Sequence, residues 1–77
     1  AQYGICVNAL APGWIATKMT TAVRENETRN AEILSRIPAG RWGNPEDFKG
    51  PAVFLASEAA AYVSGCTIPV DGGFLGR

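Results

Sequence analysis

The sequence predicts an α/β chain organised as one βαβ unit, and three observations support this class. Residues 5–11 and residues 66–70 are apolar runs that contain β-branched side chains, as in buried strands of a parallel sheet. Between them lies an amphipathic pattern with a helix start at Asn44-Pro45. Glycine and proline residues bound these segments. Parallel strands joined by a helix form a crossover that we expect to be right-handed.

The first strand is predicted over residues 5–11, bounded by Pro12-Gly13. Its apolar composition indicates burial on both faces. The second strand, residues 66–70, contains Pro69, which lacks a backbone N–H and therefore favours a sheet edge. Since two strands alone do not form a stable sheet, we expect the 77 residues to belong to a larger protein, and the absence of an initiating methionine agrees.

Residues 14–37 predict one or two short amphipathic helices. Thr20 or Thr21 is suited to cap a helix start, and Pro38 ends the helical pattern. The apolar positions at helical spacing are Ala31, Leu34 and Ile37. Charged residues fill most other positions, so we expect this segment to pack weakly on the rest of the chain and to move.

A further helix is predicted over residues 44–57. Asn44 can accept hydrogen bonds from the free amides of the first turn, Pro45 suits the first helical position, and two acidic residues follow. Pro51 is expected to bend this helix. The expected buried stripe consists of Phe48, Ala52, Leu55 and Ala59.

Composition excludes several kinds of partner and site. Seven basic and seven acidic residues give zero net charge, so nothing indicates a nucleic-acid surface or a membrane-surface stripe. No apolar run has the length of a transmembrane helix, and we expect no secretory leader. Because the chain has no histidine, histidine catalysis and histidine-containing zinc sites are excluded, and no metal site is predicted.

The two cysteines, Cys6 and Cys66, lack metal-ligand spacing. One alternative is a disulfide that closes a long loop. The pattern favours the other alternative, in which both are small, buried, apolar residues of the strands. Such unpaired cysteines suit a reducing compartment, and we expect the cytoplasm.

Chemistry is expected beyond the carboxyl end of the first strand, because open parallel sheets bind ligands there. Pro12 fixes the direction in which the chain leaves the strand, and Gly13 allows a flat ligand to approach the backbone. The backbone near Ile15 and the hydroxyl of Thr17 are then available to a polar ligand. An ordinary turn from strand to loop is the alternative interpretation of these residues.

Several stretches resemble segments of the short-chain dehydrogenase/reductase family, and together they cover nearly the whole chain. Residues 7–17 (VNALAPGWIAT) resemble the segment after the family's catalytic helix, and residues 37–47 (IPAGRWGNPED) resemble the loop before its penultimate helix. Shorter matches to its closing stretch are residues 54–57, 62–65 and 70–73. Each match is weak by itself, but their joint order is specific.

The resemblance implies the C-terminal βαβ portion of a doubly wound parallel-sheet Rossmann fold with a helical substrate lid. Residues 1–77 would be part of a single NAD(P)-binding domain, and the lid would lie at about residues 18–37. A homotetramer is implied, assembled through the 45–57 helix and the 66–70 strand. The implied ligands are a small-molecule substrate and NAD or NADP.

Each residue at the end of the first strand takes a role from the same resemblance. Pro12 and Gly13 would pass under the nicotinamide. The backbone of Ile15 would bond the carboxamide, and Thr17 would bond the carboxamide or the pyrophosphate. Trp14 would border the substrate pocket.

Within the family, the sequence is similar to bacterial sugar-acid dehydrogenases of the 2-deoxy-D-gluconate 3-dehydrogenase type. Residues 31–34, residues 36–43 and Gly50-Pro51 carry this similarity. It implies an oxidoreductase that interconverts a secondary alcohol and a ketone on a sugar acid, such as 2-deoxy-D-gluconate or a keto-deoxy-gluconate. The alternatives are a 3-oxoacyl carrier-protein reductase and a non-catalytic piece used for oligomerisation or interaction.

The catalytic residues of the family are missing from these 77 residues. The family requires Tyr-x-x-x-Lys, in which the lysine lowers the pKa of the tyrosine. Here Val7 follows Tyr3 at that spacing, and Cys66 follows Tyr62. No Gly-x-Gly phosphate loop occurs either. No catalytic residue is therefore predicted, Asn8 is interpreted as structural, and the chain is expected to be inactive by itself.

Arginine and tryptophan side chains offer further candidates for ligand contacts. A substrate carboxylate could be held by Arg24, Arg29, Arg36 or Arg41, although a solvated or structural role is favoured for each. Arg41 is expected to pair with Glu46 or Asp47 at the start of the helix predicted over residues 44–57. Trp42 is expected to serve core packing rather than substrate stacking.

Overall fold

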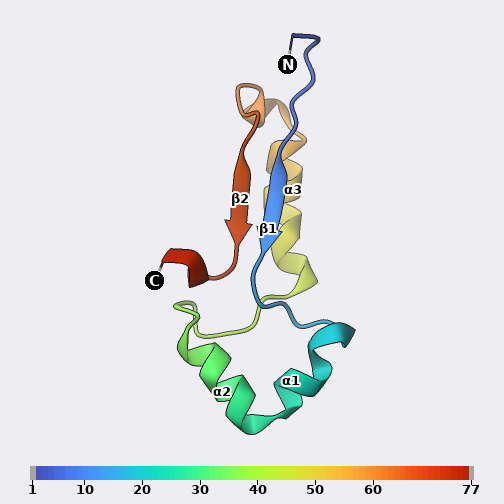
Figure 1. Ribbon diagram of the computed structural model, residues 1–77. Helices are drawn as coiled ribbons and strands as arrows, with labels where there is room; N and C mark the ends of the chain where they lie inside the picture. The colour runs from blue at the N-terminus through green and yellow to red at the C-terminus, as the bar shows by residue number, and fades with distance from the viewer. Residues whose placement is uncertain (1, 77) are drawn as a thin grey trace.

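Residues 2–76 are described by the computed structural model, which contains a pair of strands, a helix packed behind them and two helices that project beyond them (Figure 1). The strands are β1 (Ala9–Pro12) and β2 (Thr67–Val70), and the helices are α1 (Thr21–Glu25), α2 (Glu27–Ser35) and α3 (Lys49–Leu55). Short 3₁₀ turns lie at Lys18–Thr20, Pro45–Phe48, Glu58–Ala60 and Phe74–Gly76. None of the helices within the described residues has the length and apolar character needed to cross a bilayer.

β1 and β2 are adjacent and parallel, with Ala9 opposite Thr67 and Pro12 opposite Val70. This pairing confirms the predicted parallel βαβ arrangement. The carboxyl ends of both strands point toward the helical excursion, residues 18–37, which carries α1 and α2 (Figure 1). Loops and side chains at this end of the sheet are therefore brought together with the base of the excursion.

The first strand begins at Ala9 rather than at residue 5, because the side chain of Asn8 replaces the hydrogen bonds of a ladder. Asn8 Nδ2 donates to the carbonyl oxygen of Val63 at 3.0 Å, and Asn8 Oδ1 accepts from the N–H of Cys66 at 3.0 Å. A side-chain amide supplies one donor and one acceptor here, as a backbone peptide would. The structural role predicted for Asn8 is confirmed.

The predicted helix over residues 44–57 consists of a 3₁₀ turn followed by α3, and it ends early, at Leu55. Pro51 lies in the first turn of α3, where backbone N–H groups have no intrahelical partner. A change of helix type thus takes the place of the expected bend. The stripe is also corrected: Phe48 and Leu55 are half-buried, whereas Ala52 and Ala59 are exposed.

The helical excursion is divided by Asn26, which the sequence analysis did not identify as a cap. Asn26 has an extended backbone, and its Oδ1 accepts a hydrogen bond from the N–H of Arg29 at 3.0 Å, so it caps α2. Thr20 precedes α1 as predicted, but its hydroxyl makes no capping bond to that helix. An Asn inside a charge-rich run is a weak signal, and only the geometry reveals its role.

The residues of α2 that turn inward differ from the predicted ones, because Ile33 is buried in place of Ala31. Ile33 and Ile37 are buried, with exposed fractions of 7% and 4%, and Leu34 is half-buried. Ala31, which was predicted on the buried stripe, is exposed. The larger Ile33 side chain gains more from burial than alanine does, and this decides which face turns inward.

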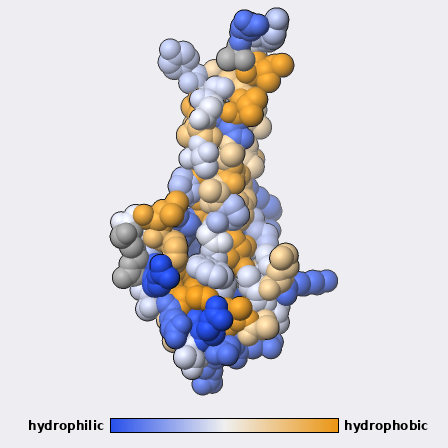
Figure 2. Space-filling model, in the orientation of Figure 1, coloured by the Kyte–Doolittle hydropathy of each residue, from blue (hydrophilic) through white to orange (hydrophobic). Residues whose placement is uncertain are grey.

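The strands are not buried as predicted. Ile33, Ile37 and Ala60 are the buried apolar residues among residues 2–76. The radius of gyration is 15.2 Å, whereas a compact domain of this length would have about 11 Å. Large apolar side chains remain exposed along the narrow part of the molecule formed by the strands and α3 (Figure 2). The prediction fails because, within the described residues, no further strand or helix covers β1.

The cysteine prediction is also corrected. Cys6 is exposed, Cys66 is half-buried, and each lies just before a strand instead of within it. Both thiols are free, so the alternative of a disulfide is not realised in the described residues. Cys6 lies outside β1 because Asn8 delays the start of that strand, and the N–H of Cys66 bonds to Asn8 Oδ1 just ahead of β2.

Candidate functional site

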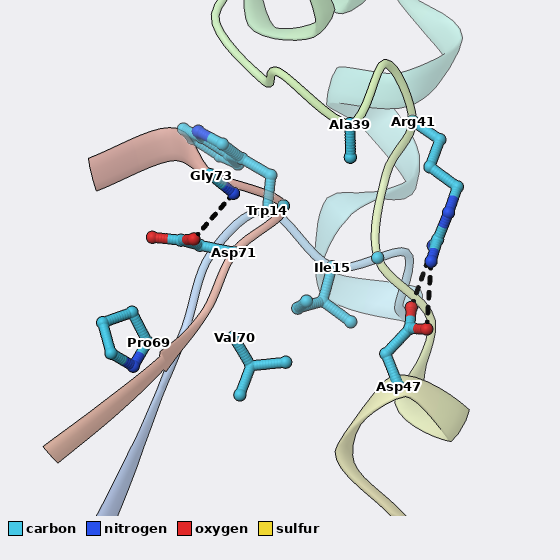
Figure 3. Close-up of a pocket in the computed structure, with 11 residues that line it drawn as sticks. Trp14, Ile15, Ala39, Arg41, Asp47, Pro69, Val70, Asp71 and Gly73 are labelled. Carbon is cyan, nitrogen blue, oxygen red and sulfur yellow. Dashed lines mark hydrogen bonds and ion pairs between the residues drawn. The ribbon is translucent and has the colours of Figure 1, made fainter. Parts of the chain in front are cut away.

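Two cavities of about 330 Å³ each open at the carboxyl ends of β1 and β2. Trp14 and Asp71 line both of them. The first cavity is also bounded by the Arg41–Asp47 pair and the side chains of Ile15 and Val70 (Figure 3). The second is lined in addition by Ala11, Pro12, Gly13, Phe74 and Leu75.

The residues predicted for a ligand site are divided between these cavities. Pro12 and Gly13 line the second, and Ile15 lines the first. Trp14, predicted to border a substrate pocket, lines both. Thr17 lines neither and is exposed on the segment that leads into the helical excursion.

Gly13 is required by close packing between the ends of the two strands. A Cβ atom at this position would lie 2.5 Å from Cβ and 2.8 Å from Cα of Asp71. The N–H of Gly13 also donates to the carbonyl oxygen of Val70 at 3.1 Å. Sequence reasoning assigned Gly13 to ligand approach, and this second reason depends on a contact with a residue distant in the sequence.

Ile15 forms an isolated parallel bridge with Gly43. The bridge is made by the neighbours of Ile15: the N–H of Gly43 donates to the Trp14 carbonyl at 2.9 Å, and the N–H of Ala16 donates to the Gly43 carbonyl at 2.8 Å. The N–H and C=O of Ile15 itself therefore face away from Gly43. The Ile15 carbonyl accepts from the Thr20 hydroxyl at 2.8 Å, and within the described residues its N–H has no acceptor.

The carbonyl oxygen of Thr17 organises the start of the helical excursion. It accepts from the N–H of Thr20 at 3.1 Å, from the Thr21 hydroxyl at 3.3 Å and from Arg24 Nη2 at 2.9 Å. Arg24 Nε also donates to Thr20 Oγ1 at 3.2 Å. These bonds confirm a structural role for Arg24.

Arg41, which was expected to pair with Glu46 or Asp47, forms a two-bond ion pair with Asp47. Arg41 Nη1 lies 2.9 Å from Asp47 Oδ2, and Nη2 lies 3.1 Å from Oδ1 (Figure 3). The N–H of Asn44 donates to Asp47 Oδ2 at 2.7 Å. The hydrogen bond from Arg41, followed by that from Asn44, lowers the pKa of Asp47 to about 2. The Asp47 carboxylate raises the pKa of Arg41 in return.

Trp42 connects the helical excursion to the end of β1. Its Nε1 donates to Asn30 Oδ1 on α2 at 2.6 Å. Its ring meets that of Trp14 edge to face, with centroids 5.8 Å apart and an angle of 76° between planes. The predicted packing role of Trp42 is supported, and the contact with Asn30 was not foreseen because no local pattern signals it.

The turn after β2 closes the opposite side of the site. Gly72 and Gly73 have positive φ of 64° and 95°, and Asp71 Oδ1 accepts from the Gly73 N–H at 2.9 Å (Figure 3). The N–H of Ala39 donates to the Gly72 carbonyl at 2.9 Å. This turn thereby joins β2 to the loop that follows α2. Within residues 2–76, no group of acidic, histidine or cysteine side chains is arranged to hold a metal ion.

Comparisons with known proteins agree along the whole chain. A family model described as enoyl-(acyl carrier protein) reductase matches residues 1–75. The 2-dehydro-3-deoxy-D-gluconate 5-dehydrogenases of Pseudoalteromonas atlantica and Escherichia coli are 65% and 61% identical over 77 residues, which are 100% of this chain and 30% of each relative.

Solved structures give the same result. An Agrobacterium tumefaciens protein, provisionally named a 2-deoxy-D-gluconate 3-dehydrogenase and crystallised with bound NADP, is 58% identical with a TM-score of 0.94, over 99% of this chain and 31% of that one. The gluconate 5-dehydrogenase of Burkholderia cenocepacia, in complex with NADP and tartrate, is 41% identical with a TM-score of 0.91, over 97% of this chain and 29% of that one.

The comparisons confirm the resemblance to sugar-acid dehydrogenases drawn from the motifs at residues 7–17 and 37–47. The chain spans about 30% of the length of the curated relatives it matches. Over that length, the strand-end geometry and the family match together show that this chain belongs to the short-chain dehydrogenase/reductase family.

Proposed function

We propose that these residues form the nicotinamide floor and the substrate lid of an NAD(P)-dependent oxidoreductase that interconverts a secondary alcohol and a ketone on a sugar acid. The observation that carries the proposal is the backbone of Ile15, whose N–H has no partner in the described residues and whose carbonyl lies on the same strand edge. A nicotinamide carboxamide offers the matching acceptor and donor. When bound, the nicotinamide supplies the hydride-transfer chemistry.

The other predicted contacts fit the same ligand. Pro12 and Gly13 line the second cavity, whose largely apolar wall suits a flat ring. Thr17 is exposed on the following segment and is proposed to bond the carboxamide or the pyrophosphate. Because the ribose contacts lie outside these residues, the proposal covers both NAD and NADP.

The helical excursion, residues 18–37, is proposed to be the substrate lid. It joins the rest of the chain through a small base that includes the buried Ile33 and Ile37, and most of its other residues are exposed. A segment attached in this way can close over a bound substrate and exclude water from the reacting atoms. Trp14, which lines both cavities, is proposed to border the substrate pocket beneath it.

The proposed substrate is a sugar acid such as 2-deoxy-D-gluconate or a keto-deoxy-gluconate, as the relatives' names suggest. A carrier-protein thioester is the second candidate, because the matching family model is described as an enoyl-(acyl carrier protein) reductase. Activity of the full-length protein on deoxy-sugar acids and on acetoacetyl thioesters separates the two. Since no Tyr-x-x-x-Lys occurs in the chain, the 77 residues alone are expected to turn over neither.

A homotetramer assembled through α3 and β2 is proposed for the full-length protein. Val53 and Phe54 of α3 are 67% and 41% exposed. An apolar helix face of this kind favours contact with another surface. The cytoplasm remains the proposed location.

Ile15 provides the direct test of the nicotinamide contact. In the full-length protein, Ile15→Pro removes the backbone N–H, and Ile15→Val keeps it with a side chain of similar shape. We expect Ile15→Pro to raise the KM for NAD(P) about ten-fold or more, because a ligand acceptor is left unpaired. Steady-state kinetics should show nearly unchanged values for Ile15→Val. An unchanged cofactor KM in a folded Ile15→Pro variant contradicts the proposed contact.

A further inference from the structure

Trp42 bridges a fixed part of the molecule and a weakly attached one. On its own loop it is flanked by Arg41, which is held by Asp47 through two bonds, and by Gly43, which is held in the bridge to Ile15. From this fixed loop, the indole N–H of Trp42 reaches Asn30 of α2 at 2.6 Å.

Asn30 occupies the inward face of α2. It precedes the buried Ile33 by three positions, so both lie on one side of the helix. Asn30 is half-buried, and its bond to the Trp42 side chain links α2 to the loop after it. The apolar contacts can slide as α2 moves, whereas a directional bond specifies one position.

The other face of Trp42 reaches the candidate ligand site. Its ring packs edge to face against Trp14, at a centroid separation of 5.8 Å. Trp14 lines both cavities and directly follows Pro12-Gly13. A displacement of α2 that breaks the bond to Asn30 therefore frees the ring that packs against the cavity wall.

We propose that Trp42 is a positioning residue that latches the lid helix α2 through Asn30 and, through Trp14, couples the lid position to the shape of the substrate pocket. The identity of the substrate rests on the proposed function, but the latch is a property of these contacts. One neutral hydrogen bond changes an equilibrium by roughly two- to ten-fold. A hydrogen bond of this strength favours the position of α2 in which Asn30 contacts Trp42, and it can still break in each turnover.

Three variants of the full-length protein test the latch. Trp42→Phe removes the donor and keeps an aromatic ring, Asn30→Leu removes the acceptor, and Asn30→Asp keeps an acceptor oxygen. Amide hydrogen exchange is measured over residues 21–35 and over α3. The expected result is exchange about two- to ten-fold faster in residues 21–35 for Trp42→Phe and Asn30→Leu, no change in α3, and near wild-type rates for Asn30→Asp. Combining Trp42→Phe with Asn30→Leu should add little to either change.

Faster exchange that extends equally to α3 would mean that Trp42 only supports the fold, and unchanged exchange over residues 21–35 would mean that the bond holds nothing; either result overturns the proposal. Kinetics add a second readout, in which the KM for the sugar acid rises and the dissociation constant for NADP does not. A rise in both overturns the coupling to the substrate pocket. Failure of the wild-type protein to act on any sugar acid counts against the proposed function alone, because the exchange measurement needs no turnover.

Discussion

The two ends of the sheet differ in how many of their side chains and backbone groups find partners within these 77 residues. The site end comprises residues 12–17, 39–47 and 69–76, and the sheet half comprises residues 5–11 and 49–68. In the site end, a two-bond ion pair, an isolated bridge and a closely packed glycine are all completed within the chain. In the sheet half, large apolar side chains face outward, among them Val7 at 71% and Val53 at 67% exposure.

This difference separates the determinants of the site from those of stability. The site end keeps its local geometry through short contacts between loops, whereas the sheet half needs outside surfaces to bury its apolar residues. Burial of apolar area is the main favourable contribution to folding, at about 25 cal/mol per Å². Contacts within the site end therefore determine the geometry of the site. Surfaces that cover the apolar residues of the sheet half are expected to supply much of the stability that maintains this geometry.

The largest effect is expected from Gly13→Val in the site end of the full-length protein. The added Cβ meets backbone and Cβ atoms of Asp71 at 2.8 and 2.5 Å, and neither can yield without moving β2. We expect a loss of about 3 kcal/mol in the free energy of unfolding, as for overpacked cores. Urea denaturation followed by circular dichroism measures it.

Gly50→Ala is the matched control in the sheet half. Apart from its chain neighbours and the backbone of its own helix, no atom lies within 4 Å of a Cβ built at Gly50, which sits inside α3. Alanine is favoured over glycine in a helix by about 1 kcal/mol, but its Cβ is disfavoured directly before Pro51. This variant should therefore change the free energy of unfolding by less than about 1 kcal/mol. The contrast between the two glycines expresses the comparison in one experiment, and a Gly13→Val variant as stable as the wild type would contradict it.

A smaller effect is expected from a charge in the sheet half. Val53→Glu places a carboxylate on the exposed face of α3 that is proposed to lie in an interface. The dissociation constant of the assembly should rise about thirty-fold, which corresponds to about 2 kcal/mol. Met19→Glu is the control, since Met19 is 94% exposed on the helical excursion and should leave the assembly unchanged. Sedimentation velocity compares them, and equal behaviour of the two variants would argue against an interface at α3.

Features that depend on neighbouring residues were predictable from the sequence. The helix start at Asn44-Pro45 and the pairing of Arg41 with one of the two acidic residues that follow, here Asp47, each depend on residues within a few positions of one another. The parallel pairing of the strands followed from composition and order. Residue types with strong local preferences therefore carried most of the correct predictions.

Features that depend on contacts across the chain were not predictable. Asn8 delays the start of the first strand because its side chain bonds to Val63 and Cys66, and Gly13 is fixed by Asp71. The hydrogen bond between Trp42 and Asn30 likewise joins segments with no shared motif. The burial of β1 was predicted as for a strand inside a complete sheet. An apolar run indicates that a strand can be buried, but it does not tell whether the covering strands and helices belong to the same 77 residues. The nicotinamide roles of Pro12, Gly13, Ile15 and Thr17 stay predictions.

The smallest effect is expected from the ion pair of the site end, and it depends on pH. The pKa of Asp47 is about 2 in the folded chain against an ordinary value of 3.8. The folded state therefore favours the ionised carboxylate, and this contribution is fully present above about pH 4. It is lost as the pH falls from 4 toward 2, because protonation removes the bonds to Arg41 and to the Asn44 N–H. The urea midpoint of the full-length protein, measured across this range, should fall more steeply for the wild type than for Asp47→Asn.

Glu46→Gln is the control for this pH dependence. Glu46 contacts Lys49 at 2.7 Å, but both side chains are more than 70% exposed, and exposed pairs contribute little. The Asp47 side chain is 32% exposed and accepts three hydrogen bonds from two residues. The two acidic residues are adjacent in the sequence, and each substitution removes one carboxylate. The experiment therefore separates the effect of the hydrogen bonds that Asp47 accepts from the effect of the charge alone. If Glu46→Gln flattens the pH profile as much as Asp47→Asn does, the hydrogen bonds of Asp47 are not the cause of the pH dependence. The comparison between the site end and the sheet half then loses this support.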